Sequence, residues 1–306
     1  MLSILTSCKS FTGPAGPLQR RAIYNWRALH PNIEIILYGK TDGVEAVIRE
    51  FDVRYIPDIG ATAKGIPYFN AIAEHATTHA LYDTQLYVNA DILLPRKLLD
   101  LIPTAWQYPR FLLCGQRIDL AQELPATFSP IGWEIQVPYL VRSGQAKLHD
   151  TTGSDYFLFP RGMWQYLPPL IIGRGGYDNA LFAFCLRQHI PLLDASWVLP
   201  VLHQFHDYSH VADGQKSSYQ GKEARQNLRL HGICRSIPTL TDADRIICGN
   251  TLHPITGRSN FLRRTEVWLY YKHNLKLLSY LFRALWHLFG GTRWRVPEPD
   301  WAALVD

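Results

Sequence analysis

The sequence has little sulfur and no closely spaced cysteine pair. It contains two methionines and five cysteines, an odd number, and the cysteines are far apart. They are Cys8, Cys114, Cys185, Cys234 and Cys248. Without a C-x-x-C motif the pattern does not favour a disulfide framework, so we expect reduced, mostly buried thiols and a cytoplasmic protein.

Long apolar runs, low-complexity segments and internal repeats are also missing. The uninterrupted apolar runs are too short to span a bilayer. The N-terminal stretch MLSILTSCKSF has no basic region and is too short for a signal peptide, so it predicts a first strand. With 306 residues, 47% of them hydrophobic, the chain can form one large or two small globular domains with a sizeable core.

Positive charge is concentrated near the C-terminus. Residues 258–296 contain Glu266 as their one acidic residue, whereas the rest of the chain is near neutral. The basic residues of this segment are Arg258, Arg263, Arg264, Lys272, Lys276, Arg283, Arg293 and Arg295. Within it, residues 261–289 have no glycine or proline and predict one or two helices.

The first half of the sequence alternates between strand-like and helix-like segments. Strands are predicted at 2–8, 33–39, 52–59, 85–94 and 110–120, and helices at 20–31, 44–51, 67–80 and 95–106. This alternation predicts an α/β fold with a mostly parallel sheet covered on both faces. Residues 121–200 are richer in aromatic residues and loops, and the polar stretch 211–227 predicts an exposed loop.

The stretch QLYVNADILLP (85–95) places two polar side chains, Asn89 and Asp91, between apolar runs. A buried carboxylate is costly unless it is paired or bound to a metal. Asp91 is therefore either a satisfied structural acid or part of a site. Ligands bind outside the carboxyl ends of the strands in such sheets, and two oxygen ligands there suit Mg²⁺ or Mn²⁺.

A second cluster lies in HQFHDYSH (203–210), which contains His203, His206, Asp207 and His210. A helix here would align the three histidines on one face. One interpretation is a set of partly buried histidines bonded to the backbone. The other is a metal site, in which neutral imidazoles bind a divalent cation and Asp207 orients one of them.

Two further acids follow glycines. In GRGGYDNALFAF (173–184), Asp178 either caps a helix or serves as a general base beside a loop that a substrate can approach. Arg174 in that loop either holds a phosphate or is solvated. In TGSDYFLFPRG (152–162), Asp155 either binds hydroxyl groups or caps a turn.

Together these blocks resemble the GT-A glycosyltransferases, nucleotide-sugar-dependent enzymes in which a D-x-D motif after a central strand holds the metal and the donor diphosphate. The triplet NAD (89–91) is similar to that motif, with Asn in the first place. The blocks GSDYFLFP, IGRGGYDNAL and HQFHDYSH resemble a poorly described bacterial and plant branch of GT-A-like proteins. The resemblance covers roughly residues 1–210. It implies a GT-A-like domain at 1–210. Outside the resemblance, composition predicts a polar loop and linker at 211–257 and a basic, aromatic helical tail at 258–306.

The resemblance also implies a reaction and a set of site residues. A sugar would pass from a nucleotide-sugar donor to a hydroxyl of a saccharide or lipid-linked acceptor, with Mn²⁺ or Mg²⁺ as cofactor. Asp91, Asn89, His206 and then His203 would hold the metal, and Asp178 and Asp155 would act on the acceptor. The donor contacts would be Ser7, Thr12, Gly13, Asn89, Asp91, Arg117 and Arg174.

Other interpretations remain open at this level. The four residues His203, His206, Asp207 and His210 would equally suit a metal-dependent hydrolase or phosphoesterase. The imperfect triplet would suit a non-catalytic nucleotide-binding module. The tail predicts either a helix pair packed on the catalytic domain or an interfacial helix on anionic lipid at the inner face of the membrane. Nucleic acid is not expected, because no binding module is recognisable.

Overall fold

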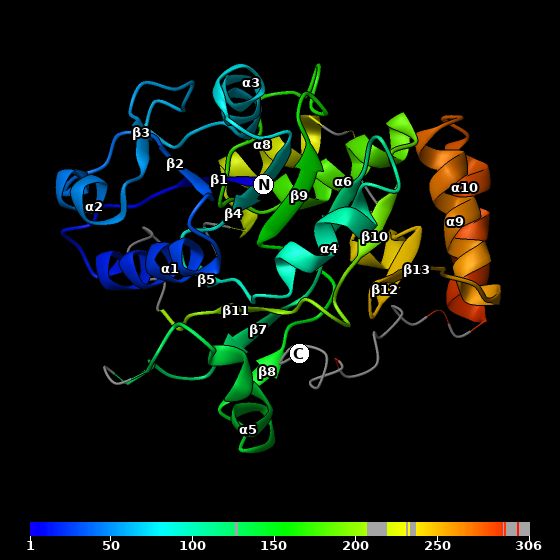
Figure 1. The fold of residues 1–306 in the computed structure, drawn as a ribbon. Coiled ribbons are helices and arrows are strands. Elements are labelled where there is room, and N and C mark those ends of the chain that lie inside the picture. Colours follow the sequence, from blue (N-terminus) through cyan, green and yellow to red (C-terminus); the bar gives the residue numbers. More distant parts are fainter. Residues whose placement is uncertain are drawn as a thin grey trace.

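The fold is built on a large sheet and a small one (Figure 1). The computed structural model describes residues 1–125, 128–206, 219–230, 232, 237–289, 291 and 299. Within them, a nine-stranded sheet has the order β13 (Thr251–Pro254), β12 (Arg245–Cys248), β10 (Leu192–Asp194), β6 (Leu112–Cys114), β9 (Tyr156–Pro160), β4 (Thr84–Val88), β1 (Leu2–Ser7), β2 (Glu34–Tyr38) and β3 (Arg54–Ile56). A four-stranded sheet has the order β5 (Ile92–Leu93), β11 (Val201–His203), β7 (Arg117–Leu120) and β8 (Ala146–Leu148).

Most strand pairs of the large sheet are parallel, which confirms the predicted fold class. The antiparallel exceptions involve β9, which lies between β4 and β6, and β13 at the edge. Successive side chains of a strand point to opposite faces. Along β4, Leu86 and Val88 accordingly join one apolar core and Tyr87 joins the other. Both faces of the sheet are therefore buried, as the continuous apolar strands predict.

Helices surround the sheets. In the first half these are α1 (Ala15–Leu29), α2 (Val44–Phe51), α3 (Phe69–His79) and α4 (Leu98–Ala105). The second half adds α5 (Val137–Arg142), α6 (Tyr177–Gln188), α8 (Lys222–Leu230), α9 (Arg258–Tyr271), α10 (Lys276–Leu288) and the 3₁₀ turns η1 (Trp133–Ile135) and η2 (Leu240–Asp242). No helix in the described part of the chain combines the length and the apolar character that a membrane span requires.

Three predicted elements have different bounds. The strand predicted at 85–94 is two strands, β4 and β5, which belong to different sheets, and the strand predicted at 110–120 divides in the same way into β6 and β7. The polar residues of each segment lie where the chain leaves the large sheet. Helix α1 begins at Ala15 rather than at residue 20, because Pro17 is tolerated in a first turn.

Residues 211–257 contain more regular structure than a loop. Helix α8 occupies 222–230, where the polar composition predicted a loop, and β12 and β13 extend the large sheet beyond β10. Residues 211–218 lie outside the described part of the chain. Our division of the chain at residues 210 and 258 stays a prediction.

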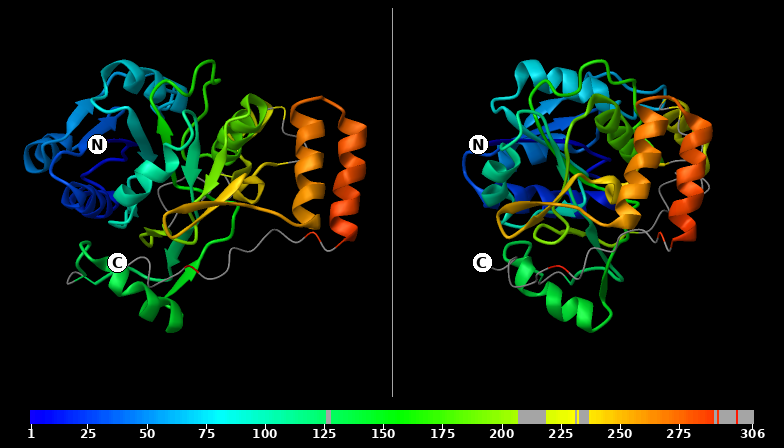
Figure 2. Two further views of the ribbon diagram at one scale, coloured as in Figure 1. Left: turned by 45° about the vertical axis from the view of Figure 1, so that its right-hand side comes forward. Right: turned by 90° about the vertical axis from the view of Figure 1, so that its right-hand side faces the viewer.

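Helices α9 and α10 form a hairpin at the β13 end of the large sheet, opposite α1 and α2 (Figure 2). The segment 261–289 thus forms two helices. Arg263 of α9 anchors the hairpin, because its guanidinium group bonds to both carboxylate oxygens of Asp242 at 2.8 and 2.9 Å and to Glu266 at 2.9 Å. Among described residues, Cys8, Cys114, Cys185 and Cys248 are free thiols, of which Cys114 and Cys185 are buried and Cys8 and Cys248 are partly exposed.

Candidate metal and donor site

The linker between β4 and β5 positions Asp91. Strand β4 ends at Val88 and β5 begins at Ile92, so Asp91 lies at the carboxyl end of β4. Strand β11 pairs with β5 in an antiparallel register that sets His203 opposite Ile92. The backbone N–H of Gln204 donates to the Asp91 carbonyl at 3.2 Å. This strand pairing brings the histidines of one segment beside the acid of another.

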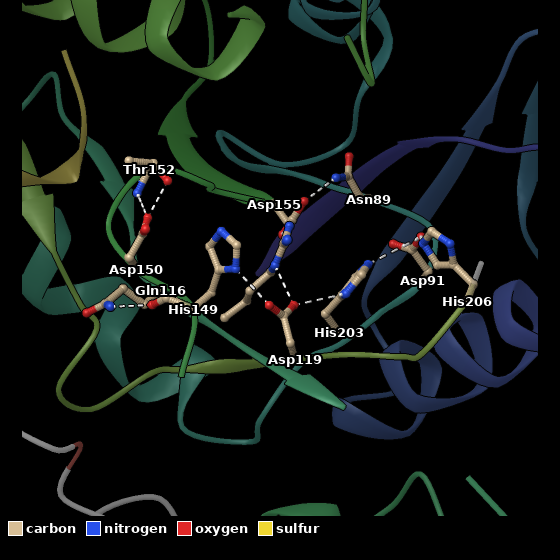
Figure 3. A network of polar contacts seen from close by, with 11 residues as sticks. Asn89, Asp91, Gln116, Asp119, His149, Asp150, Thr152, Asp155, His203 and His206 are labelled. Atoms are coloured by element: carbon tan, nitrogen blue, oxygen red, sulfur yellow. Dashed lines mark hydrogen bonds and ion pairs between the residues drawn. The ribbon is translucent and has the colours of Figure 1, made fainter. Parts of the chain in front are cut away.

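Asp91, His203 and His206 form a group of potential metal ligands (Figure 3). One ligand atom from each residue lies within 4.8 Å of the others. Oδ2 of Asp91 is 3.2 Å from Nε2 of His206 and 3.9 Å from Nε2 of His203. Oδ1 of Asp91 is buried and has no hydrogen-bond partner among the described residues. An orphaned carboxylate oxygen beside two imidazoles fits a divalent cation.

Electrostatics keep Asp91 ionised. Burial alone would raise the pKa of this carboxyl group. The hydrogen bond from His206, the positive charges of His203 and His206 in their protonated forms and the charge of Lys9 outweigh that effect and hold the pKa of Asp91 well below the usual range when no metal is bound. A carboxylate that is already charged is in the state that a cation requires.

Asn89 is oriented differently from Asp91. Its side-chain amide donates to Oδ1 of Asp155 at 2.6 Å, and its carbonyl oxygen is 3.5 Å from the hydroxyl of Tyr177. The side chain is thereby directed to Asp155 rather than to the two histidines (Figure 3). A role for Asn89 as a metal ligand stays a prediction.

Arg117 and Asp155, predicted as a donor contact and a catalytic acid, bind each other. Nη1 of Arg117 donates to Oδ2 of Asp155, and Nε donates to Oδ1 of Asp119 at 2.8 Å. Both oxygens of Asp155 are thus engaged, one by Arg117 and the other by Asn89. The two carboxylates beside Arg117 raise the pKa of its guanidinium group although burial opposes this. The roles predicted for both residues stay predictions.

Sequence reasoning did not identify Asp119. Strand β7 pairs with β11 so that Asp119 faces His203, and Oδ1 of Asp119 is 3.2 Å from Nδ1 of His203. Its other oxygen is 2.7 Å from Nδ1 of His149. The signal in the sequence is the alternation of RIDL (117–120), which puts two charges on one face of an otherwise apolar strand. Asp207 and His210 lie outside the described residues.

Asp178 lies in the first turn of α6 and is buried. Burial raises the pKa of its carboxyl group to about 6, and the charge of Asp155 adds to the rise. Backbone hydrogen bonds from Asn179 and Ser154 oppose it. The group is thus protonated at mildly acidic pH and ionised above it, which suits a general base near neutral pH.

The end of β1 and the loop after it contain the other predicted donor contacts. Ser7 lies 3.3 Å from the hydroxyl of Tyr87, Thr12 lies 2.8 Å from Ser10, and the carbonyl of Gly13 accepts from Gly16 at the start of α1. Because β1 runs parallel to β4 and pairs with it, this loop and Asp91 emerge at the same edge of the sheet.

Two cations accompany the group. The charge of Lys9, a residue we did not single out from the sequence, lowers the pKa of the Asp91 carboxyl group. Burial lowers the pKa of the Lys9 ammonium group, and Arg174 lowers it further. Nε of Arg174 donates to Oε2 of Glu223 at 2.6 Å, which ties α8 to the loop before α6.

Comparison with known proteins gives likenesses of fold only. No family model and no curated protein sequence matches the chain. Glucosyl-3-phosphoglycerate synthase of M. tuberculosis is similar over 77% of this chain and 82% of its own, with 13% identity and a TM-score of 0.45. The same protein in complex with Mn²⁺, uridine diphosphate and phosphoglyceric acid gives 12% identity and a TM-score of 0.45, over 77% of this chain and 80% of that one. TarS of S. aureus is similar over 42% of this chain and 23% of its own, with 10% identity and a TM-score of 0.30.

Proposed function

We propose that the protein is a metal-dependent glycosyltransferase that moves a sugar from a nucleotide-sugar donor to an acceptor hydroxyl, with Mn²⁺ or Mg²⁺ as cofactor. The observation that carries this proposal is the convergence of Asp91, His203 and His206, with a buried Asp91 oxygen that lacks a partner among the described residues. The group lies at the carboxyl edge of a mostly parallel sheet, where such folds bind their ligands.

In this proposal the donor diphosphate binds beside Asp91, His203 and His206. A divalent cation held there would neutralise the negative charge of the leaving nucleotide diphosphate. Lys9 and Arg174 add positive charge near the same place. The donor would also contact the backbone at the end of β1, at Ser7, and in the loop after it, at Thr12 and Gly13. Both lie at the same edge of the sheet.

Asp178 is the better candidate for the group that removes the proton from the acceptor hydroxyl. Its pKa of about 6 leaves it ionised at neutral pH, with enough basicity to accept a proton. Asp155 has both oxygens engaged by Arg117 and Asn89. We therefore assign Asp155 the role of holding these two side chains in place.

The hairpin of α9 and α10 supports an acceptor at a lipid surface. Leu277, Leu281 and Leu288 lie on one side of α10 and are 87, 54 and 76% exposed. Helix α10 has no acidic residue, and the one acid of α9, Glu266, is buried against Arg263. An apolar strip among cations complements anionic lipid.

A thermal-shift screen tests the proposed transfer. UDP-, GDP-, ADP- and dTDP-type ligands are added to the purified chain with and without Mn²⁺. We expect one of them to raise the melting temperature more in Mn²⁺ than without it, and Asp91→Ala to abolish that difference. Asp58→Ala, which removes an exposed acid that pairs with Lys40, is the control. If no nucleotide stabilises the protein in Mn²⁺, the proposed function is wrong.

A further inference from the structure

The carboxylate of Asp119 lies behind His203, on the side of the imidazole away from Asp91 (Figure 3). Nδ1 of His203 is 3.2 Å from Oδ1 of Asp119. Nε2 of the same ring is 3.9 Å from Oδ2 of Asp91. The imidazole thus lies between two carboxylates, and a different one faces each ring nitrogen.

We propose that Asp119 is a positioning residue for the metal site. It accepts the Nδ1 proton of His203, so that Nε2 carries the lone pair and is directed toward Asp91 and His206. A neutral imidazole has one N–H group and one bare nitrogen. A carboxylate bonded to one nitrogen of a ligating histidine fixes the tautomer and the ring orientation. This inference rests on the proposed metal-dependent function.

Asp119 is itself held rigidly by its neighbours. Nε of Arg117 donates to Oδ1 of Asp119, and another nitrogen of Arg117 donates to Asp155. On the other side, Nδ1 of His149 lies 2.7 Å from Oδ2 of Asp119. The backbone adds to this, because the register of β7 and β11 places Asp119 opposite His203. The carboxylate is therefore restrained from several directions while one of its oxygens restrains His203.

The arrangement gives Arg117 and Asp155 a role that requires no contact with the donor. The side chains of Arg117 and Asp155 are 12 and 9% exposed, so these charges are largely enclosed. They form a chain of polar contacts from Asp155 through Arg117 and Asp119 to His203. Removing a charge from this chain should loosen the imidazole and weaken the metal site, without removing any ligand.

Titration of Mn²⁺ alone into the metal-free protein, followed by calorimetry, tests the inference. Asp119→Asn should weaken Mn²⁺ binding by about 10- to 100-fold, the usual range when the partner of a ligating group is altered. The control is Glu34→Gln, which removes another buried carboxylate that pairs with an arginine, Arg54. Glu34 lies at the amino end of β2, away from the ligands, so Mn²⁺ affinity should stay unchanged there.

A double variant separates positioning from general loss of structure. If Asp119 acts through His203, Asp119→Asn should change the Mn²⁺ affinity of His203→Ala by less than about twofold, since the two changes are not independent. Wild-type affinity in Asp119→Asn, with binding still lost in Asp91→Ala, would overturn the inference and leave the proposed function standing. Equal Mn²⁺ affinity in the wild type and Asp91→Ala would overturn the metal site itself, and this inference with it.

Discussion

The side-chain amide of Asn89 donates a hydrogen bond to Oδ1 of Asp155 at 2.6 Å. Asn89 is the first residue of the NAD triplet, and an ionised acid in its place could not donate this hydrogen bond. A carboxylate at residue 89 would face the carboxylate of Asp155, and like charges in contact repel each other. The hydrogen bond to Asp155 thus explains why residue 89 is an asparagine.

Asn89→Asp, which would restore an acidic pair in the triplet, is expected to destabilise the protein. It removes a hydrogen bond to a charged group and adds repulsion, so the free energy of unfolding should fall by about 1–3 kcal/mol. Urea denaturation followed by circular dichroism measures the change. Mn²⁺ affinity should not improve. A variant that is as stable as the wild type and binds Mn²⁺ more tightly would contradict this account.

Asp178 and Asp194 are a matched pair of buried acids, and burial raises the pKa of each to about 6. The folded protein therefore binds these protons more readily than the unfolded chain does. The contribution of this proton binding to the free energy of unfolding is fully present below about pH 4 and is lost as the pH rises through 6. Replacement of either acid by Asn should raise stability at pH 8 by up to about 3 kcal/mol, with little gain at pH 4. Denaturation at the two pH values measures this.

The same pair tests the catalytic role of Asp178. Asp178→Asn should lower sugar transfer by about 10²- to 10⁴-fold, the range of a lost general base. Asp194→Asn should leave it nearly unchanged, because the carboxylate of Asp194, at the end of β10, accepts a hydrogen bond from the backbone N–H of Ser196. The rate of wild-type transfer should rise with pH through about 6. Equal activity of the two variants would show that Asp178 is structural.

Arg263 and Arg264 are adjacent on α9 but should contribute very differently to stability. Arg263 is buried with Asp242 and Glu266, and its loss leaves two buried carboxylates without this partner. Arg263→Ala should therefore cost about 3–5 kcal/mol. Arg264 pairs with Asp244 in a partly exposed contact, and Arg264→Ala should cost about 0–1 kcal/mol. Urea denaturation of both variants checks the difference, and similar losses would contradict it.

Membrane contact through α10 is tested by flotation with vesicles. The wild type should bind vesicles that contain phosphatidylglycerol and not those of phosphatidylcholine alone. Leu277→Glu combined with Leu281→Glu should reduce binding by about tenfold or more, because both apolar side chains are lost and negative charge is added. Tyr166→Glu is the control, since Tyr166 is 97% exposed and lies outside the hairpin. If the double variant floats as the wild type does, the proposed surface is wrong. It is also wrong if the wild type itself does not bind these vesicles because the strip joins two copies of the chain.

The local sequence pattern was sufficient to predict the mostly parallel sheet and the position of Asp91 at its edge. Apolar strands alternating with helical segments predict a mostly parallel sheet, and the acid after an apolar strand then falls at its carboxyl edge. The pattern failed where a segment changes sheets, because both halves of 85–94 and of 110–120 contain apolar residues typical of strands. Only hydrogen-bonding partners distant in sequence separate β4 from β5 and β6 from β7.

The sequence by itself determined which side chains are available, namely an acid between apolar strands and a histidine-rich segment after another strand. The tertiary structure decided which of them meet. His203 lies beside Asp91 and Asp119 because β11 pairs with β5 on one side and with β7 on the other. Asn89 is directed to Asp155 because β9 lies against β4. Strand register between distant segments depends on the packing of the whole sheet, so no local pattern could have revealed the partners of these residues.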